Sequence, residues 1–282
     1  MKKEIRTAVY DDELRLEAYR LTGTRQNFPK HFHGYYVIGL VEEGERCLFC
    51  RDREYVVRKG DVILFNPGDS HGCIQADDGT LDYRGLNIAK EVMLDFAWEV
   101  LGKRVLPGFF SAVIQDEEAA ECFRLFHEMV INGIQGIGKE EQLLLLMAIL
   151  LERYAQKSEE CAPQSRDGID RACAFMEAHY ADRLSLDQIC AHAHLSKSTL
   201  LRAFTKEKGV TPYCYLENIR IGEAKKLLEQ GDTPMQTAMR TGFFDQSHFT
   251  NCFNRYIGLS PGVYRGIFRD KREKRDTKNE EY

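Results

Sequence analysis

An internal repeat of 49 residues in the C-terminal third of the chain is the feature that most constrains its fold. When the region from residue 169 onward is shifted against itself by 49 positions, apolar, small and turn-forming residues recur. Each copy has the pattern of a helix, a tight turn and a second helix, so we expect two helix-turn-helix units in tandem. The aligned pairs are Ile189/Ala238, Ala193/Gly242, Leu195/Phe244, Ser198/Ser247, Leu200/Phe249, Phe204/Phe253, Gly209/Gly258, Thr211/Ser260 and Pro212/Pro261.

Helix-start signals lie at equivalent places in the two copies. Ser or Thr followed three residues later by Gln is a capping box, in which two side chains satisfy backbone N–H groups at a helix start. Ser, Asp and Pro also favour helix N-termini. Residues 213–230, between the copies, predict one long helix. The expected signals are the boxes Ser185/Gln188 and Thr233/Gln236, Pro234 at a first helical position, and the N-caps Ser196 and Asp245.

The second helix of each copy has an apolar face for its own core and a polar face opposite. The inward residues are expected to be Leu200, Ala203 and Phe204 in the first copy and Phe249, Cys252 and Phe253 in the second. A polar stripe at this spacing suits base edges in the major groove, although one such stripe alone is also an ordinary solvated face. Lys197, Lys206 and Arg255 are expected at phosphates. The predicted contacts to double-stranded DNA are Lys197, Ser198, Thr199, Leu201, Arg202, Thr205, Lys206, Gln246, Ser247, Thr250, Asn251 and Arg255.

The N-terminal region has a different pattern. Short apolar and β-branched runs alternate with turn signals up to about residue 87, which is typical of a small antiparallel barrel or sandwich. Helical spacing follows over residues 88–101. We therefore place a barrel with flanking helices in residues 1–105, where the mouth of a barrel is a usual ligand site.

Two more helices are predicted over residues 117–131 and 139–154, within a helical packing or dimerisation segment of residues 106–156. The first should bury Cys122, Leu125, Phe126 and Met129 on one face. The second is apolar nearly all round, so the barrel, a neighbouring helix or a second subunit must cover it, and we expect a homodimer. Residues 157–168 are a polar linker, 169–268 the DNA-binding domain and 269–282 a charged tail.

Charge and cysteine usage narrow the class of protein. Residues 165–282 hold 19 Lys and Arg against 16 Asp and Glu, a formal charge of +3, which leaves −8 on residues 1–164. This asymmetry suits an acidic sensor joined to a mildly basic DNA reader. Nine irregularly spaced cysteines, no secretory signal and no membrane-length apolar run predict a cytoplasmic protein without a membrane partner. Cys47 and Cys50 have CxxC spacing but lie in a predicted strand, on opposite faces.

Residues 169–266 resemble the DNA-binding domain of the AraC/XylS family of transcriptional regulators. The stretches that carry the resemblance are TGFFDQSHFTNCFNRYIGLSPGVYR (241–265), LSKSTLLRAFTKEKGVTPYCYLENIR from residue 195, and EAKKLLE. The resemblance implies a bilobal domain of seven helices, two helix-turn-helix units bridged by a long helix, with recognition helices in successive major grooves. The expected fold is therefore multidomain, a cupin-like antiparallel β-barrel followed by an all-α domain.

The N-terminal region is similar to the cupin-like sensor of the same family. His31-Phe32-His33 and Gly60-Asp61 with Pro67-Gly68-Asp69-Ser70-His71 match the two short cupin motifs. The glutamate that joins three histidines in a metal-binding cupin is replaced by Val37. His31 and His33 alternate along one strand face, so both, with Tyr35, are expected to line the barrel interior.

Three interpretations of these histidines remain open. His31, His33, Tyr35 and His71 form an effector pocket; or His31, His33 and His71 hold a divalent metal, since three imidazoles suffice for zinc; or the side chains serve as structural hydrogen-bonding groups. No other cofactor is expected. We interpret the chain as a transcriptional regulator, not an enzyme, that senses an unidentified small molecule. The alternatives are a metal-dependent cupin enzyme with a DNA-binding module, and a DNA-binding protein without an effector.

Overall fold

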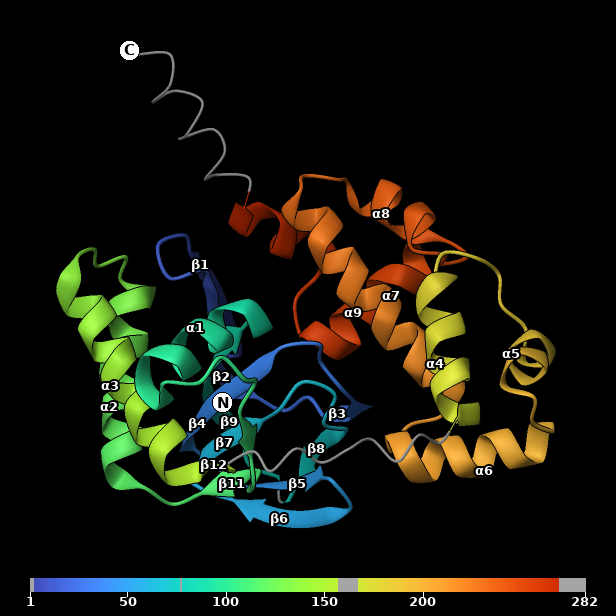
Figure 1. Cartoon of the computed structure of the whole chain (residues 1–282). Helices are drawn as coiled ribbons and strands as arrows, with labels where there is room; N and C mark the ends of the chain where they lie inside the picture. Colours follow the sequence, from blue (N-terminus) through green and yellow to red (C-terminus); the bar gives the residue numbers. More distant parts are fainter. Residues whose placement is uncertain (1–2, 77, 157–166, 269–282) are drawn as a thin grey trace. The chain divides into compact units, whose positions relative to one another are not determined.

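The structure, a computed structural model, describes residues 3–76, 78–156 and 167–268. The chain divides into two compact units, residues 1–28 with 32–161 and residues 162–282 with 29–31. We call the first the β unit and the second the helical unit (Figure 1). The predicted linker at 157–168 lies outside the described residues up to 166, and the predicted tail at 269–282 lies outside them entirely.

The β unit contains two main antiparallel sheets. One has the strand order β1-β2-β9-β4-β7-β11, the other β3-β8-β5-β6, and β10 pairs with β12. The strands are β1 (Ile5–Asp11), β2 (Leu16–Thr24), β3 (Phe28–His31), β4 (Tyr36–Glu43), β5 (Arg46–Cys50), β6 (Arg53–Val57), β7 (Val62–Phe65), β8 (His71–Gln75), β9 (Leu81–Ile88), β10 (Gly108–Phe109), β11 (Val113–Ile114) and β12 (Ala155–Gln156).

Alternation along β4 separates the two cores of this unit. Ile38 and Leu40 are buried in a cluster shared with the helices, whereas Val37 and Val41 join a second cluster shared with β5, β6 and β7. Successive side chains of a strand point to opposite faces. The six-stranded sheet is therefore buried on both faces, one against the helices and one against the other sheet. Val37, where a metal-binding cupin has glutamate, packs in the second cluster.

Three helices cover one face of the six-stranded sheet: α1 (Lys90–Leu101), α2 (Glu117–Ile131) and α3 (Ile137–Tyr154). Helices α2 and α3 lie side by side, and α2 contacts β1, β2, β4 and β9 (Figure 1). The expected face of α2 is partly wrong, because Leu125 is 55% exposed. The buried stripe runs through Ala119, Phe123, Phe126 and Val130 instead, a face turned by less than one residue step.

The helical unit carries the two copies of the repeat. Its helices are α4 (Asp167–Ala178), α5 (Leu186–Ala193), α6 (Lys197–Lys208), α7 (Pro212–Glu229), α8 (Pro234–Arg240) and α9 (Gln246–Ile257), and residues 261–268 are also helical. The long helix α7 contributes Leu216 to the core around α4–α6 and Ile221, Ala224 and Leu228 to the core around α8 and α9. It bridges the two copies as predicted.

The fold class follows from these two units. An antiparallel β domain precedes an all-helical domain with two helix-turn-helix copies, which confirms the expected multidomain architecture. Within the described ranges, none of the helices combines the length and the apolar character needed to cross a membrane.

Candidate DNA interface and effector site

The predicted caps fix where the helices of both copies begin. In the first box Ser185 N–H donates to Gln188 Oε1 (2.8 Å) and Gln188 N–H to Ser185 Oγ (3.3 Å). Thr233 and Gln236 make the same pair of bonds, at 2.9 and 3.3 Å. The second helices are capped by Ser196, which accepts from Thr199 N–H at 3.3 Å, and Asp245, which accepts from His248 N–H at 2.7 Å. All four predicted starts are confirmed, and they set the phase of α6 and α9.

The turns between the paired helices differ in detail. Helix α5 runs to Ala193 and is followed by His194 in the left-handed region (φ 55°), whereas α8 ends at Arg240, two residues before Gly242, the counterpart of Ala193. Its turn uses Gly242, with φ 75°. A Cβ atom on Gly242 would lie 2.6 Å from the carbonyl oxygen of Ala181. Glycine is therefore needed here both for the positive φ and for the close approach of the Ala181 backbone.

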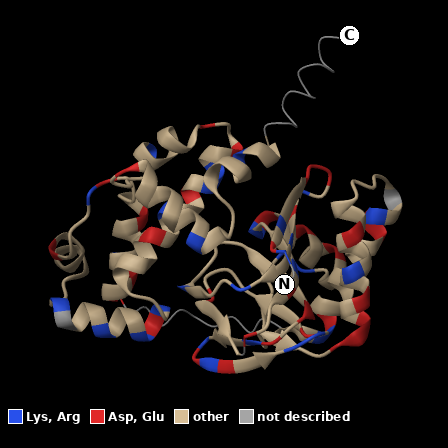
Figure 2. Cartoon of the chain, turned by 180° about the vertical axis from the view of Figure 1, so that it is seen from behind, with Lys and Arg blue, Asp and Glu red and all other residues tan. Residues whose placement is uncertain are grey.

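Helix α6 presents the predicted outer face of the first copy. Leu200 and Phe204 are fully buried, and the residues predicted to contact DNA lie on the opposite side. Basic positions recur along α6 (Figure 2). Two predicted contacts have intramolecular partners: Lys197 Nζ is 2.6 Å from Asp187 Oδ1, and the Thr199 hydroxyl is 2.8 Å from Ser196 Oγ. Exposed are Lys197, Thr199, Leu201, Arg202, Thr205 and Lys206, while the side chain of Ser198 lies outside the described part of the structure.

Helix α9 presents the outer face of the second copy. Phe249, Cys252 and Phe253 are buried as predicted, which leaves the polar stripe outward. The helix carries a single basic residue, Arg255, so its outer face is mostly neutral, unlike that of α6. Neutral amide and hydroxyl groups can hydrogen-bond to base edges as well as to phosphate oxygens. Exposed are Gln246, Ser247, Asn251 and Arg255, and Thr250 is half-buried.

A buried carboxylate that sequence reasoning missed anchors α9 to α7. Glu217, 3% exposed, accepts from Cys252 Sγ (3.3 Å), Tyr256 Oη (3.1 Å) and Arg255 Nη2 (3.0 Å). Burial and the Glu217 charge raise the pKa of the Cys252 thiol to about 12, so it is a neutral donor. The guanidinium of Arg255 thus has a structural partner beside its predicted phosphate role. Glu217 follows Leu216, which lies in the apolar stripe of the predicted long helix. That position was the one sequence signal that the carboxylate is buried.

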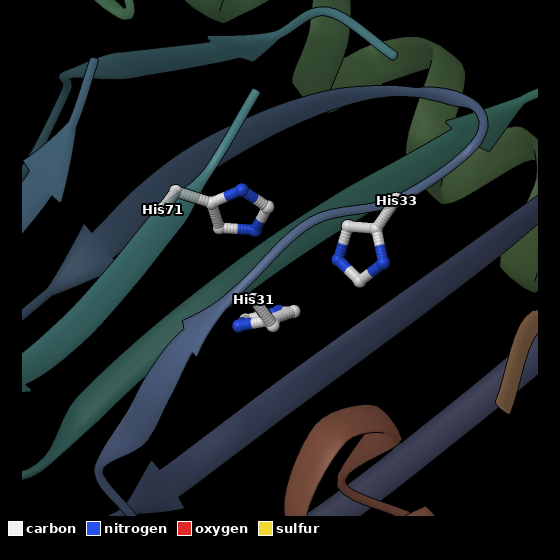
Figure 3. A group of neighbouring side chains, drawn as sticks. All are labelled: His31, His33 and His71. Atoms are coloured by element: carbon white, nitrogen blue, oxygen red, sulfur yellow. The ribbon is translucent and has the colours of Figure 1, made fainter. Parts of the chain in front are cut away.

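Three predicted histidines come together (Figure 3). His31 ends β3, His33 follows in the loop to β4, and His71 begins β8. One ligand nitrogen from each can be chosen so that all three lie within 4.8 Å of one another. The grouping follows from topology, because β3 and β8 are hydrogen-bonded neighbours although 40 positions separate His31 from His71.

Backbone and ring contacts orient these imidazoles. The Nδ1–H groups of His31 and His71 donate to the carbonyl oxygens of Pro29 (2.7 Å) and Asp69 (2.9 Å). Because a carbonyl can only accept, Nδ1 carries the proton in both rings. His33 stacks on Tyr35, with ring centroids 4.8 Å apart. Burial lowers the pKa of His31 to about 4, against the opposing effect of the bond to Pro29, so this imidazole is neutral at pH 7.

Two tyrosines near this cluster were also missed by sequence reasoning. Tyr19 on β2 and Tyr83 on β9 are hydrogen-bonded through their side chains, with ring centroids 5.9 Å apart. Each ring covers a glycine: a Cβ on Gly85 would collide with Tyr19, and one on Gly39 with Tyr83. Burial raises the pKa of both phenols. The sequence signal for this pair was glycines within strands, which leave room for large aromatic side chains on neighbouring strands. Which tyrosine lies over which glycine is known only once the pairing of β2, β9 and β4 is known.

Comparison with known proteins assigns the chain to a family. Residues 13–150 match the AraC-like ligand binding domain family, and residues 189–267 match a helix-turn-helix domain family. The chain is 43% identical over 249 residues to the HTH-type transcriptional regulator YbfI of Bacillus subtilis, covering 88% of this chain and 90% of that protein. The chain belongs to the AraC/XylS family. It is also 28% identical over 245 residues to the arabinose operon regulatory protein of Escherichia coli, with coverage of 84% and 82%.

Solved structures agree with the AraC-type fold. A crystal structure of apo ToxT from Vibrio cholerae superposes with a TM-score of 0.58 at 15% identity and covers 92% of this chain and 99% of that one. The AraC-like ligand binding region contains the histidine cluster, and the helix-turn-helix region contains both candidate recognition helices. The chain is thus an AraC-type transcriptional regulator with an N-terminal ligand-binding domain.

Proposed function

We propose that this AraC-type regulator reads a specific duplex sequence with the outer faces of α6 and α9, and that a small molecule bound in the β unit changes that reading. The observation that carries the DNA part is the repetition of one arrangement. Two helices, each capped by a side chain that accepts from the backbone N–H three residues on, bury an aromatic face and leave a hydrogen-bonding face outward. Two outward faces on lobes joined by the single helix α7 suit adjacent major grooves, about 34–36 Å apart along one side of the duplex.

Different residues are proposed for bases and for phosphates. Arg202 suits guanine, Gln246 and Asn251 suit adenine, and Leu201, 40% exposed, suits a thymine methyl group. Lys197, Lys206 and Arg255 are proposed at phosphates. For Lys197 and Arg255 this requires exchange of their partners Asp187 and Glu217 for phosphate oxygens. The Lys197–Asp187 pair is exposed on both sides, so this exchange costs little.

The effector is proposed to bind at His31, His33, Tyr35 and His71. Support comes from the match of residues 13–150 to a ligand-binding domain and from the convergence of these side chains. A ligand shifts the protein between two arrangements only if it binds one of them more tightly. We propose that the protein is a homodimer formed through the partly exposed apolar face of α3, which includes Leu145. The effector would change how the DNA-binding domains of this dimer are arranged. A protein with this role acts in the cytoplasm.

A selection from random duplex DNA at near-physiological salt tests the DNA part. The full chain should enrich two short motifs whose centres lie one helical turn apart. Enrichment of one motif alone would restrict reading to one of the two helices, and no enrichment would contradict sequence-specific binding.

Arg202→Ala gives a sharper test on the selected sequence. We expect a loss of about 1–3 kcal/mol in binding free energy and relaxed preference at one base pair, because a bidentate arginine–guanine contact is removed. Competition binding against the full set of single-base variants measures both effects. Lys206→Ala is the matched control from the same helix and should weaken all sequences alike. A uniform loss in Arg202→Ala would make Arg202 a phosphate contact.

Effector binding is tested by thermal-shift screening of metabolites followed by DNA binding with and without each stabilising compound. A compound that raises the unfolding temperature and changes operator affinity supports the proposal. Substitution of His33 should abolish that response and leave DNA affinity without the compound unchanged, since the histidines lie outside the helix-turn-helix region. Loss of effector-free DNA binding in this variant would contradict the separation of roles.

A further inference from the structure

We propose that His31, His33 and His71 bind one divalent transition-metal ion of the zinc class. This goes beyond the proposed function, which requires neither a metal nor a particular chemistry of the effector. Neither the family match nor the relatives assign a metal to the chain. The three imidazoles are the largest group of histidines that the described part of the chain brings together (Figure 3).

The distances suit a metal after small side-chain adjustments. Zinc–nitrogen bonds are about 2.0–2.1 Å, so the nitrogens of a tetrahedral site lie roughly 3.3 Å apart. The three ligand nitrogens here lie within 4.8 Å of one another. They come from a strand end, the adjoining loop and the start of the neighbouring strand. Two of the three ligands therefore have fixed backbones, and the loop position of His33 can close the remaining gap.

The hydrogen bonds of the rings have the arrangement that metal-bound histidines use. A metal-binding imidazole donates its second N–H to a carboxylate or backbone carbonyl, which fixes the tautomer and the ring orientation. His31 and His71 both do so through Nδ1, to Pro29 and Asp69. The lone pair then lies on Nε2 in both rings.

The chemistry of the donor set selects the metal. Three imidazoles favour zinc, cobalt, nickel or copper over magnesium and calcium, which prefer oxygen. With Val37 in place of an acidic ligand, the fourth position falls to a water or to an oxygen of a bound molecule.

A second cluster, Glu217, His248 and Cys252 on α7 and α9, is the competing candidate. Its groups already satisfy one another, since the Cys252 thiol donates to Glu217, which also accepts from Arg255 and Tyr256. The raised pKa of Cys252 disfavours the thiolate that a metal needs. This cluster therefore serves the packing of α9, and it supplies a control.

Metal titration of the chelator-treated full chain tests the site. Co²⁺ and Zn²⁺ are added alone, without DNA or any effector, and binding is followed by calorimetry and by cobalt ligand-field absorption. The variants are His71→Asn and His33→Asn, with far-UV circular dichroism as the folding check, and His248→Gln as the matched control. Two separate ligand variants protect the test against one that fails to fold.

We expect one equivalent of metal, a tetrahedral cobalt spectrum without a thiolate charge-transfer band, and an affinity loss on the order of 100-fold or more in each ligand variant that folds. His248→Gln should bind as the wild type does. Absence of stoichiometric binding, a cobalt–thiolate band, or binding unchanged in both ligand variants would overturn the proposal. Because the titration involves neither operator nor effector, these failures would leave the proposed regulatory function standing.

Discussion

At the scale of single residues, Gly242 and Gly222 show how one residue type serves opposite needs. Gly242 has φ 75° and its missing Cβ makes room for the Ala181 carbonyl, whereas Gly222 lies exposed in α7 with open space around it. Gly242→Ala should destabilise the helical unit by roughly 1–3 kcal/mol through strain and collision. Gly222→Ala should stabilise it by about 0.5–1 kcal/mol, because alanine favours helix.

Hydrogen exchange of the α8 and α9 amides in the full chain measures both effects on the helical unit. The decisive result is a lower protection from exchange in Gly242→Ala and a higher protection in Gly222→Ala, each compared with the wild type. Equal protection in wild type and Gly242→Ala would show that the turn can rearrange without cost.

His127 gives the β unit a dependence on pH. The residue is fully buried on α2, its Nε2–H donates to the Tyr19 carbonyl (2.9 Å), and its Nδ1 has no hydrogen-bond partner among the described residues. Burial lowers its pKa from 6.5 to about 4, although the Tyr19 bond opposes the shift. The unfolded state then binds the proton more readily than the folded state, so stability is full above pH 6.5 and falls as the pH drops towards 4.

The expected loss from this one residue between pH 7 and pH 5 is about 2 kcal/mol in the free energy of unfolding. Urea titrations at the two pH values, followed through Trp98 in α1, measure it. His127→Gln keeps an N–H donor for Tyr19 but cannot titrate, so its stability should change less over the same range. Equal pH dependence in wild type and variant would assign the effect to other groups, the histidine cluster first.

At the scale of elements, the caps decide how well the reading helices are formed. Asp245 Oδ1 accepts from His248 N–H at 2.7 Å and holds the first turn of α9, where Gln246 and Ser247 lie. Asp245→Ala should cost about 1 kcal/mol and fray that turn, with an operator affinity several-fold lower. Asp245→Asn should keep the cap. Both variants lose the same charge, so a difference between them in unfolding or operator binding reports the cap, and equal behaviour would contradict it.

What the sequence could predict was local. The caps, the bounds of α2 and the long helix α7 depend on neighbours within one or two turns, and these predictions are confirmed to within a residue or so. The histidine cluster was predictable from two short motifs. Leu125 was misplaced because two stripes on α2 have similar apolar content, and only packing on the sheet selects between them. Glu217 and the Tyr19–Tyr83 pair depend on contacts across elements, which periodicity does not contain.

At the scale of the whole molecule, the acidic half and a homodimer would change the salt dependence of DNA binding in opposite directions. The quantity to compare is the affinity of the full chain relative to that of the fragment of residues 165–282. Residues 1–164 carry a formal charge of −8 and residues 165–282 one of +3. If the acidic half repels DNA, the full chain binds non-specific duplex more weakly than the fragment of residues 165–282 at low salt. The difference in affinity between the full chain and the fragment should narrow between about 0.02 and 0.15 M salt, because the screening length falls towards about 8 Å. A dimer with two readers neutralises more phosphates and has a steeper salt dependence than the fragment, so its advantage should shrink with salt.

A duplex of about 20 base pairs, long enough for one pair of adjacent major grooves, isolates the charge effect because a second reader has nowhere to bind. On it we expect the ratio of full-chain to fragment affinity to rise with salt, measured by fluorescence anisotropy at matched protomer concentrations. On a duplex twice as long, a homodimer should reverse this trend, because the added phosphate contacts outweigh the screened repulsion. A ratio that rises on both duplexes would argue against a dimer that reads with two subunits. A ratio independent of salt on the short duplex would mean that the acidic half has no electrostatic influence on DNA binding.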